Sequence, residues 1–167
     1  MKIAVMGSGG WGTALALVLL ENGHDVTLWS YTEEESAVLR ERGENPMLKG
    51  VPLPEGLRLT SDPACASGCG AVVLATPSFA VRTTARTLAP LLEPGAVLVS
   101  VSKGIEKDTS LTLTESIAQE VGEGHPIVAL SGPSHAEEVG RGVPTAVVAA
   151  SRDRSAAELV QDLFMNG

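Results

Sequence analysis

Residues 2–16, KIAVMGSGGWGTALA, contain a short apolar run, a glycine-rich turn and the start of a second apolar run. Gly7, Gly9 and Gly12 have the spacing G-x-G-x-x-G. Between a strand and a helix, the first glycine permits the tight turn, the second lets the backbone approach a pyrophosphate, and the third lets the helix pack closely on the strand. The segment therefore predicts a turn that holds a dinucleotide at a helix N-terminus, where free N–H groups and the helix dipole attract phosphate.

The residues around this turn favour the same interpretation. An apolar helix follows the turn and ends at Asn22-Gly23, and Asp25-Val26-Thr27-Leu28-Trp29 is typical of a second strand. These elements form a βαβ unit of about 30 residues. Glycine-rich turns of this spacing also occur in methyltransferases, in kinases and in ordinary loops. A purely structural turn therefore stays open as the alternative.

The rest of the chain alternates apolar runs with amphipathic segments. The apolar runs are typical of strands that are buried on both faces of a parallel sheet. They occupy residues 71–75, 96–102, 127–130 and 145–150, and helical periodicity marks residues 79–92, 109–121 and 156–165. We predict one α/β domain over residues 1–167, with a Rossmann-type doubly wound and mostly parallel sheet that binds a dinucleotide.

The composition excludes some classes of function. The 20 acidic and 12 basic side chains give a formal charge of −8, which argues against nucleic acid or an anionic membrane as the main partner. No apolar run approaches the roughly 18 residues of a membrane span, and Met1-Lys2 leads into a strand without a signal peptide, so we expect a cytoplasmic protein. Cys65 and Cys69 have no histidine nearby, and we interpret them as packing residues rather than metal ligands.

The end of the second strand is where such domains distinguish NAD from NADP. A carboxylate there binds the 2′-hydroxyl of NAD, whereas an arginine accepts the 2′-phosphate of NADP. This chain has Ser30 and Tyr31 instead, so the choice between the two cofactors is left open. We assign the glutamates at 33–35 to the first turn of the next helix, where Thr32 and Glu35 have the spacing of a capping box.

Residues 43–63 have no regular pattern, because prolines and glycines interrupt them repeatedly. We predict a long surface loop that closes with a short strand at 57–60. Long loops of this kind often act as binding lids. A connecting arm without a role in binding is the equally open alternative.

Lys103 directly follows the apolar run 96–102, and Gly104 allows the chain to bend away after it. Ligands of open parallel sheets bind beyond the carboxyl ends of the strands. We therefore expect the Lys103 ammonium group in the same crevice as the glycine turn, where it faces the ligand. The alternative is an ordinary solvated lysine.

The apolar run 127–130 leads into Ser131-Gly132-Pro133-Ser134-His135-Ala136-Glu137-Glu138. Ser134 and Glu137 have capping-box spacing, which predicts a helix whose N-terminus points into the crevice. His135 is a candidate general acid, although a histidine in this position more often packs or is solvated.

These motifs together resemble the N-terminal domain of bacterial NAD(P)-dependent glycerol-3-phosphate dehydrogenase over nearly the whole chain. The resemblance rests on the glycine turn through Ala16, on Trp29, and on residues 102–106 and 131–138. To the cofactor contacts Gly7, Gly9 and Gly12 of the glycine motif, the resemblance adds Gly10, Trp11, Tyr31, Lys103 and Ala136. It implies the substrate contacts Lys103, Gly132 and Ser134, and Lys103 is the expected catalytic residue in this chain. We expect no metal site.

The resemblance also implies a reaction, the reduction of dihydroxyacetone phosphate to glycerol 3-phosphate by NADH or NADPH, for phospholipid synthesis. Members of the family continue into an all-helical domain that supplies the proton-transferring lysine, and we expect that domain to lie outside this chain. The chain alone is then expected to bind cofactor without turnover, and the intact protein to form a homodimer.

Two departures from the family pattern concern the cofactor preference and the contacts of the loop. Tyr31 replaces a basic residue that many members have near the ribose, and residues 46–50 differ from the usual aromatic-Leu-Pro run. Two other functions stay open. One is a different hydroxyacid-type dehydrogenase that uses NAD or NADP, and the other is a dinucleotide-binding module without catalysis.

Overall fold

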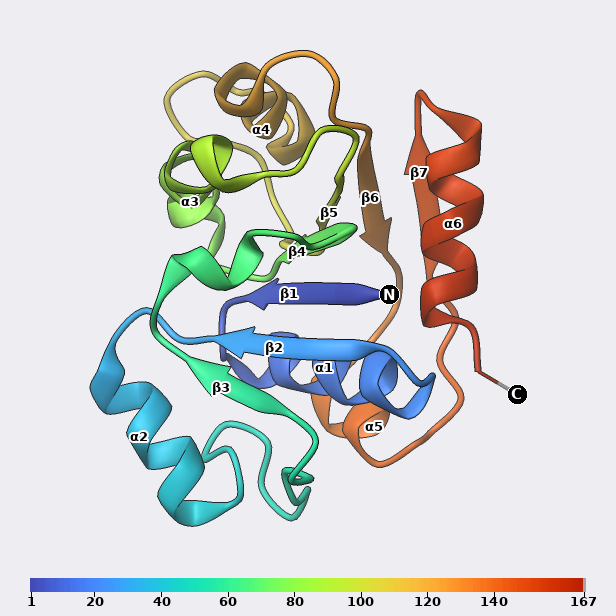
Figure 1. Cartoon of the computed structure of the whole chain (residues 1–167). Coiled ribbons are helices and arrows are strands. Elements are labelled where there is room, and N and C mark those ends of the chain that lie inside the picture. Colours follow the sequence, from blue (N-terminus) through green and yellow to red (C-terminus); the bar gives the residue numbers. More distant parts are fainter. Residues whose placement is uncertain (167) are drawn as a thin grey trace.

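A seven-stranded sheet forms the centre of the molecule (Figure 1). The computed structural model describes residues 1–166. The strands lie in the order β3-β2-β1-β4-β5-β6-β7, and all neighbours are parallel except β6 and β7. The strands are β1 (Lys2–Met6), β2 (Asp25–Trp29), β3 (Arg58–Thr60), β4 (Ala71–Leu74), β5 (Val97–Ser100), β6 (Ile127–Ser131) and β7 (Val148–Ser151). The predicted α/β fold with a mostly parallel sheet is confirmed.

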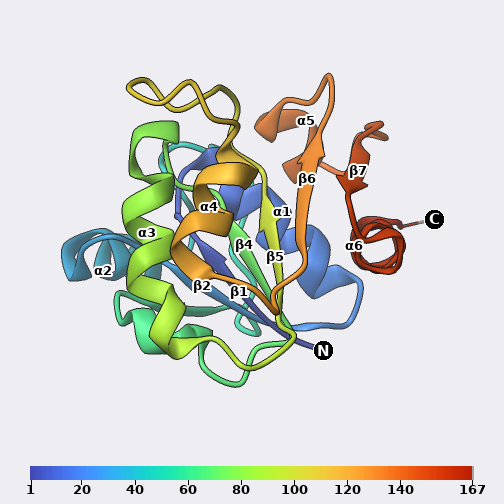
Figure 2. The ribbon, with the colours of Figure 1, turned by 90° about the horizontal axis from the view of Figure 1, so that it is seen from above.

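Helices cover both faces of the sheet. Figure 2 shows α3 and α4 on one side and α1 and α6 on the other. The helices are α1 (Gly10–Glu21), α2 (Glu33–Arg42), α3 (Val81–Leu88), α4 (Leu113–Val121), α5 (Ala136–Gly140) and α6 (Arg154–Phe164), with 3₁₀ turns at Pro63–Ala66, Ser78–Ala80 and Ala89–Leu91. The sheet is therefore doubly wound.

Each face of the sheet has its own apolar core, because successive residues of a strand point to opposite faces. In β1, Ile3 and Val5 belong to the core shared with α1 and α6, whereas Ala4 and Met6 belong to the core shared with α3 and α4. All four side chains are buried. Burial on both faces explains why the central strands are almost entirely apolar.

The direction in which strands are added to the sheet reverses at β1. The chain places β2 and β3 on one side of β1 and then crosses to place β4 on its other side. At such a switch point the loops that follow the two central strands diverge and leave a crevice at the carboxyl ends. Gly7 follows β1 and Ala75 follows β4, so the glycine turn borders this crevice.

The helix α1 is apolar around most of its circumference, and segments outside the sheet cover part of it. Leu48 and Val51 pack on Ala14 of α1, together with side chains of α5. Leu48 is 1% exposed. The prediction of a surface loop at residues 43–63 is therefore wrong for these residues, because they bury a side of α1 that the sheet leaves free.

The turn that follows α1 contacts both ends of the described chain. Asn22 Nδ2 donates hydrogen bonds to the carbonyl oxygens of Leu163 (2.8 Å) and Met165 (3.3 Å). The backbone N–H of Asp25 donates to the carbonyl oxygen of Met1 (2.9 Å). The first strand and the last helix thus meet at the end of α1 that is remote from the glycine turn.

The helix predicted at residues 109–121 begins later, at Leu113. Thr112 is its N-cap and forms a capping box with Glu115. A capping box fixes a helix start because each side chain bonds a backbone N–H that the helix leaves free. The prediction for residues 109–111 is wrong, since they belong to the preceding loop. The capping box predicted for Thr32 and Glu35 at the start of α2 is present.

Other boundaries shift by a few residues. The core of the helix predicted at 79–92 is the α-helix α3, with 3₁₀ turns at both ends, and the strand predicted at 145–150 is β7, which begins at Val148. Residues 154 and 155 also belong to the last helix, because the Asp153 carboxylate caps it by accepting from the N–H groups of Ser155 and Ala156.

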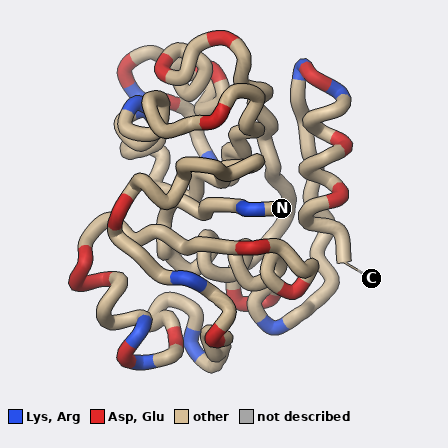
Figure 3. The backbone as a smooth tube through the Cα atoms, in the orientation of Figure 1, with Lys and Arg blue, Asp and Glu red and all other residues tan. Residues whose placement is uncertain are grey.

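Acidic and basic positions are intermixed along the chain rather than gathered in one segment (Figure 3). In the described part of the molecule, no helix is long and apolar enough to cross a bilayer. Cys65 and Cys69 are free thiols. Cys65 lies in the 3₁₀ turn at Pro63–Ala66, and Cys69 follows that turn. Burial raises the pKa of the Cys65 thiol to about 11, so it stays protonated at neutral pH.

Candidate functional site

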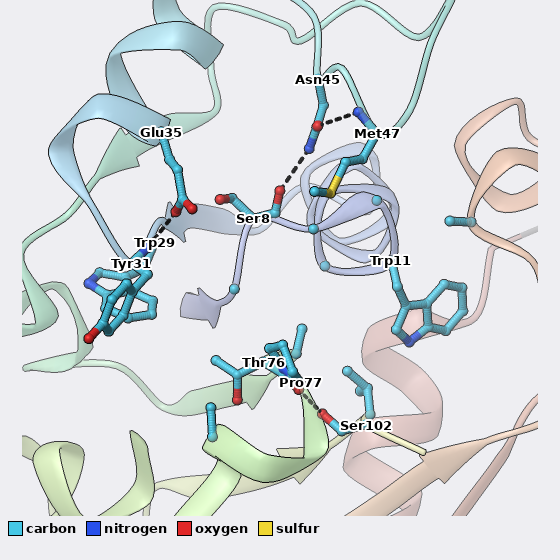
Figure 4. Close-up of a pocket in the computed structure, with 18 of the residues that line it drawn as sticks. Ser8, Trp11, Trp29, Tyr31, Glu35, Asn45, Met47, Thr76, Pro77 and Ser102 are labelled. Atoms are coloured by element: carbon cyan, nitrogen blue, oxygen red, sulfur yellow. Dashed lines mark hydrogen bonds between the residues drawn. The ribbon is translucent and has the colours of Figure 1, made fainter. Parts of the chain in front are cut away.

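A cleft of about 1260 Å³ opens at the carboxyl ends of β1 and β4 (Figure 4). Pockets for drug-sized molecules occupy about 300–1,000 Å³, so this cleft accommodates a larger ligand. Its walls come from the glycine turn, the end of β2 with α2, the loops after β4 and β5, and residues 134–136. The fold therefore brings together the segments that the sequence analysis identified separately.

The three glycines of the G-x-G-x-x-G turn have different surroundings. Gly7 has a φ of +125°, and a Cβ there would lie 2.7 Å from the carbonyl oxygen of Ala75. A Cβ on Gly12 would lie 1.9 Å from the carbonyl oxygen of Gly7, whereas a Cβ on Gly9 would meet nothing within 4 Å. The fold requires Gly7 and Gly12, while the space beside Gly9 is open to a ligand.

The N-terminus of α1 presents backbone donors to the cleft. Gly9 is the N-cap, without a side chain to cap the helix, and the N–H of Thr13 donates the first helical bond to Gly9 O (2.9 Å). The N–H groups of Gly10, Trp11 and Gly12 therefore have no partner within the helix. The first turn of α1 contains no acidic residue, so its positive dipole end favours an anion.

Asn45 connects the 43–63 loop to the glycine turn, and the sequence analysis did not identify it. Its Nδ2 donates to Ser8 O (2.8 Å) and to Thr13 Oγ1 (2.6 Å), and its Oδ1 accepts from the backbone N–H of Met47 (2.9 Å; Figure 4). Asn45 is 2% exposed. The asparagine before a proline was a turn signal, but its partners are distant in sequence and only the fold reveals them.

Gly10 is the second contact between this loop and the turn. A Cβ on Gly10 would lie 2.7 Å from the carbonyl oxygen of Met47 and 3.6 Å from the Cβ of Ala136. The loop residues Pro46 and Met47 line the cleft. This part of the loop therefore borders the cleft.

The end of β2 forms another wall of the cleft. Tyr31 is 80% exposed and packs edge-on against Trp29, with ring centroids 6.1 Å apart. The Glu35 carboxylate accepts from the backbone N–H groups of Tyr31 (3.1 Å) and Thr32 (3.4 Å). This carboxylate is thus engaged in the helix cap, while the Tyr31 ring is free to contact a ligand.

Arg40 of α2 is engaged in an ion pair. Its guanidinium donates to the Glu33 carboxylate and to Leu59 O (3.3 Å), and the Ser61 hydroxyl donates to Glu33 Oε2 (2.7 Å). Hydrogen bonds from Ser61 and Arg40 lower the pKa of Glu33. The Arg40 guanidinium is therefore paired with Glu33 rather than free to bind a ligand beside Tyr31.

Lys103 lies on the wall of the cleft beyond the end of β5. Ser102 Oγ donates to Thr76 O (2.5 Å) and so joins the loops that follow β5 and β4. Lys103 Nζ donates to the carbonyl oxygen of Gly132 (3.4 Å), and Gly104 has a φ of +115°. The ammonium group therefore stands where the loops after β5 and β6 meet.

The segment after β6 differs from the expectation. The helix α5 has five residues, and His135 rather than Ser134 is its N-cap. Ser134 Oγ donates to the carbonyl oxygen of Gly132 (3.3 Å), so the hydroxyl is turned back and does not cap a helix. The predicted capping box of Ser134 and Glu137 is therefore wrong, and α5 has no side-chain cap.

Gly132 does not itself line the cleft but connects two residues that do. Its carbonyl oxygen accepts from Lys103 Nζ and from Ser134 Oγ. A Cβ at this position would lie 2.5 Å from Ala146 O. Packing against the segment before β7 therefore requires a glycine here, and that packing aims the carbonyl at Lys103. Ser134, His135 and Ala136 do line the cleft.

A dinucleotide fits the groups that the cleft presents. Thr76 Oγ1 is buried in the cleft wall and has no hydrogen-bond partner among the described residues. A buried hydroxyl normally has a partner, and a ligand oxygen could provide it. This hydroxyl, the free N–H groups of α1 and the open space at Gly9 together suit the phosphates and sugars of NAD or NADP.

The doubly wound sheet with a glycine turn at its switch point defines a dinucleotide-binding domain of the Rossmann type. Residues 2–157 match the family model described as NAD-dependent glycerol-3-phosphate dehydrogenase N-terminus. The chain belongs to this family of NAD(P)-dependent enzymes, and the resemblance drawn from its motifs is confirmed.

Individual relatives agree with this assignment. The chain is 50% identical to glycerol-3-phosphate dehydrogenase [NAD(P)+] of Moorella thermoacetica and 44% identical to that of Agathobacter rectalis, over 99% of this chain and 49% of each relative. Glycerol-3-phosphate dehydrogenase of Coxiella burnetii has a TM-score of 0.92 and 34% identity, over 99% of this chain and 51% of that structure. The chain thus spans about half the length of these relatives.

The fold alone is less specific than the sequence. A UDP-D-ManNAc dehydrogenase from Pyrococcus horikoshii superimposes with a TM-score of 0.83 at 16% identity. At that identity the likeness shows a common fold and no common substrate. The motifs, rather than the sheet, therefore carry the assignment to the family.

Proposed function

We propose that this chain is the dinucleotide-binding part of an enzyme that reduces dihydroxyacetone phosphate to glycerol 3-phosphate with NADH or NADPH. The observation that carries the proposal is the convergence of the glycine turn, Lys103 and Ser134 on one cleft. The nicotinamide supplies the hydride chemistry when the cofactor is bound. The residues of this chain bind and orient the two ligands.

The cofactor contacts in this proposal follow the cleft. The backbone around Gly7, Gly9 and Gly12, with the N–H groups of Gly10 and Trp11, holds the pyrophosphate. Tyr31 lies beside the adenosine ribose, and Ala136 borders the far wall. Open space beside Gly9 and the orphaned Thr76 hydroxyl support this arrangement.

Lys103 is the proposed catalytic residue of this chain. A substrate carbonyl oxygen becomes negative as the carbonyl carbon accepts hydride, and an ammonium group aimed at that oxygen lowers the energy of the transition state. Lys103 stands on the cleft wall beside Ser134 and Gly132. Ser134 and Gly132 are the proposed substrate-binding residues. Ser134 lines the cleft, whereas Gly132 does not line it and accepts a hydrogen bond from Lys103 Nζ.

The whole-protein properties belong to the same proposal. The chain is one dinucleotide-binding domain, a helical domain supplies the proton-transferring lysine, and the intact enzyme is a cytoplasmic homodimer. The coverage of about half of each relative supports a second domain. The alternative of another hydroxyacid-type dehydrogenase is less well supported, because the relatives cited above are glycerol-3-phosphate dehydrogenases.

Binding and turnover measured on the purified 167-residue chain test the proposal. We expect a saturable change in protein or NADH fluorescence, from which a dissociation constant is obtained. We expect no oxidation of NADH on addition of dihydroxyacetone phosphate. A chain that binds neither NADH nor NADPH contradicts the proposed cofactor role. Turnover that depends on dihydroxyacetone phosphate contradicts the requirement for a second domain.

A further inference from the structure

The loop that carries Lys103 has few supports near the lysine itself. It runs from the end of β5 at Ser100 to the start of α4 at Leu113. Lys103 Nζ has one long hydrogen bond, to Gly132 O, and the Ile105 side chain is 62% exposed. On one side of the lysine, Ser102 Oγ donates to Thr76 O (2.5 Å). The contacts that hold the loop on the other side therefore help to fix the position of the ammonium group.

A part-buried ion pair provides that support three residues after Lys103. Arg82 of α3 donates from Nε to Glu106 Oε1 (2.5 Å) and from Nη2 to Glu106 Oε2 (2.7 Å). The Arg82 and Glu106 side chains are 22% and 18% exposed. A guanidinium that grips both oxygens of a carboxylate restricts its partner in direction as well as in distance. The Thr109 hydroxyl also donates to this carboxylate.

The loop closes on itself around Glu106. The backbone N–H of Glu106 donates to Leu111 O (2.9 Å), and the N–H of Ser110 donates to Glu106 O (3.0 Å). Ser110 has a φ of +59°, a conformation that few residues other than glycine adopt. Backbone and side chain therefore make Glu106 the anchor of the whole loop.

Helix α4 in turn holds Arg82. Arg82 Nη1 donates to Glu120 Oε1 (2.8 Å) and Nη2 to Gln119 Oε1 (2.9 Å), while Arg86 Nε donates to Glu120 Oε2 (2.8 Å). The Glu120 side chain is 13% exposed. Networks of this kind hold their members far more rigidly than an isolated surface pair does.

Arg82 is absent from the residues that line the cleft, although Thr83 and Thr84 of the same helix line it. Any influence of Arg82 on a ligand must therefore pass through a neighbour. Glu106 is that neighbour, and only Gly104 and Ile105 separate it from Lys103.

We propose that Arg82 is a positioning residue for Lys103. By holding Glu106 against α3 and α4, it fixes the loop so that Lys103 Nζ stays beside Gly132 O on the cleft wall. The inference rests on the proposed function and on the cofactor contact that the family resemblance implies for Lys103. It adds a residue outside the cleft on which the geometry of the cleft depends.

A double-mutant cycle on the 167-residue chain tests the proposal. The variants are Arg82→Gln, Lys103→Met and both together, and the measured quantity is the NADH dissociation constant. If Arg82 acts through Lys103, Arg82→Gln raises that constant about fivefold in the parent chain and leaves it unchanged when residue 103 is already methionine, a non-additivity typical of coupled residues. Arg82→Lys keeps the charge but loses the two-pronged grip, so we expect it to rescue the affinity only in part.

Arg154→Gln is the matched control. Arg154 pairs with Glu158 on the surface of α6, with the two side chains 91% and 59% exposed. This variant should leave the NADH dissociation constant unchanged. Circular-dichroism melts of every variant identify any that is not folded at the temperature of the binding assay, and the assay is then run on Arg82→Lys, which retains the charge.

The outcomes separate this inference from the proposed function. Equal weakening by Arg82→Gln in both backgrounds overturns it, because Arg82 then acts independently of Lys103. An unchanged dissociation constant for Arg82→Gln, with a raised one for Lys103→Met, also overturns it while leaving the cofactor role of Lys103 intact. If Lys103→Met itself changes nothing, the proposed role of Lys103 in cofactor binding fails, and the inference fails with it.

Discussion

The side-chain amide of Asn45 donates a 2.8 Å hydrogen bond to the carbonyl oxygen of Ser8, and so ties the long loop to the glycine turn across 37 residues of sequence. The same amide donates to Thr13 in α1. The loop that borders the cleft is therefore attached to the turn and to the helix that would hold the ligand phosphates.

Replacing Asn45 should affect stability and cofactor affinity together. Asn45→Ala leaves the part-buried Ser8 carbonyl and the buried Thr13 hydroxyl without this donor, and such a loss typically costs about 1–3 kcal/mol. We expect the NADH dissociation constant to rise about tenfold, or ~1.4 kcal/mol, because the loop no longer holds the turn. Urea unfolding and fluorescence titration measure the two effects.

Asn22→Ala is the control for that experiment. Asn22 also donates from its side chain to backbone carbonyls, those of Leu163 and Met165, but at the remote end of α1. It should lower the free energy of unfolding without changing the NADH dissociation constant. Equal losses of affinity in both variants would show that Asn45 acts only through general stability.

Substitutions of Gly9 and Gly12 should change different properties, the first cofactor affinity and the second stability. Gly9→Val places a side chain in open space and should leave the melting temperature nearly unchanged, but it should weaken NADH binding at least a hundredfold, or ~2.7 kcal/mol, since it fills the space of the pyrophosphate. Gly12→Val meets the carbonyl oxygen of Gly7, at 1.9 Å from an ideal Cβ, and should lower stability by about 1–3 kcal/mol or more.

Gly56→Ala is a neutral reference for those two variants. A Cβ at Gly56 meets only the side chain of Leu20, at 3.8 Å, and the residue does not line the cleft. It should alter neither melting temperature nor affinity. If Gly9→Val melts as early as Gly12→Val, the assignment of Gly9 to the ligand rather than to the fold is incorrect.

Cofactor preference should respond to Tyr31. The end of β2 carries Ser30 and Tyr31, which are neither a carboxylate nor an arginine. Glu35 caps α2 and Arg40 pairs with Glu33. We expect less than about a tenfold preference between NADH and NADPH, or ~1.4 kcal/mol. Tyr31→Arg adds a cation where the 2′-phosphate would lie and should strengthen NADPH binding about tenfold.

Tyr31→Gln separates the charge from the loss of the ring. It should weaken both cofactors alike, because it removes the ring and adds no cation. Parallel titrations with NADH and NADPH give the ratio for each variant. A hundredfold preference for one cofactor in the parent chain would show that another residue distinguishes the 2′-hydroxyl of NADH from the 2′-phosphate of NADPH.

The ion-pair network should make stability depend on pH in a defined window. Hydrogen bonds from Arg82 and Thr109 lower the pKa of Glu106 from 4.5 to about 2, and those from Arg86 and Arg82 lower the pKa of Glu120 to about 2. Carboxyls with a depressed folded-state pKa stabilise the protein fully above pH 4.5. They lose that contribution as the pH falls toward 2.

The stability difference between the parent chain and Arg82→Gln should follow the same window. Urea unfolding should show the largest difference at pH 6–7, a shrinking one below pH 4.5, and almost none near pH 2. Arg154→Gln should differ little from the parent at every pH, since its pair is exposed. A difference that persists unchanged at pH 2 would mean that Arg82 stabilises the fold by packing rather than by charge.

Periodicity and apolar runs predict most of this fold, because a parallel sheet buries both faces of its central strands. β4 is apolar at every position, and β1 at every position after Lys2, for that reason. The glycine spacing likewise predicts the turn, since Gly7 and Gly12 meet atoms only a few residues away or in the adjacent strand loop. Local chemistry is sufficient wherever the partner of a residue is close in sequence or belongs to a regular element.

Other features depend on contacts that the sequence does not display. Thr109 and Thr112 are equally plausible helix caps by type, and the binding of Thr109 to Glu106 helps to place it in the loop while Thr112 starts α4. Ser134 has capping spacing, but its hydroxyl turns to Gly132 instead. Both bonds are local, but each acceptor also binds a distant residue, Glu106 binding Arg82 and Gly132 binding Lys103. Asn45 and Arg82 went unnoticed because their own partners are distant in sequence.

The contacts of Asn22 and Asp25 with the two chain ends determine where a probe can be attached. Met1 and Met165 both meet the turn after α1, whereas the glycine turn lies at the other end of that helix. Twelve helical residues correspond to about 18 Å. A dye or a surface tether at either end therefore reports on the domain without touching the cleft, and affinities measured on an immobilised chain should equal those measured in free solution.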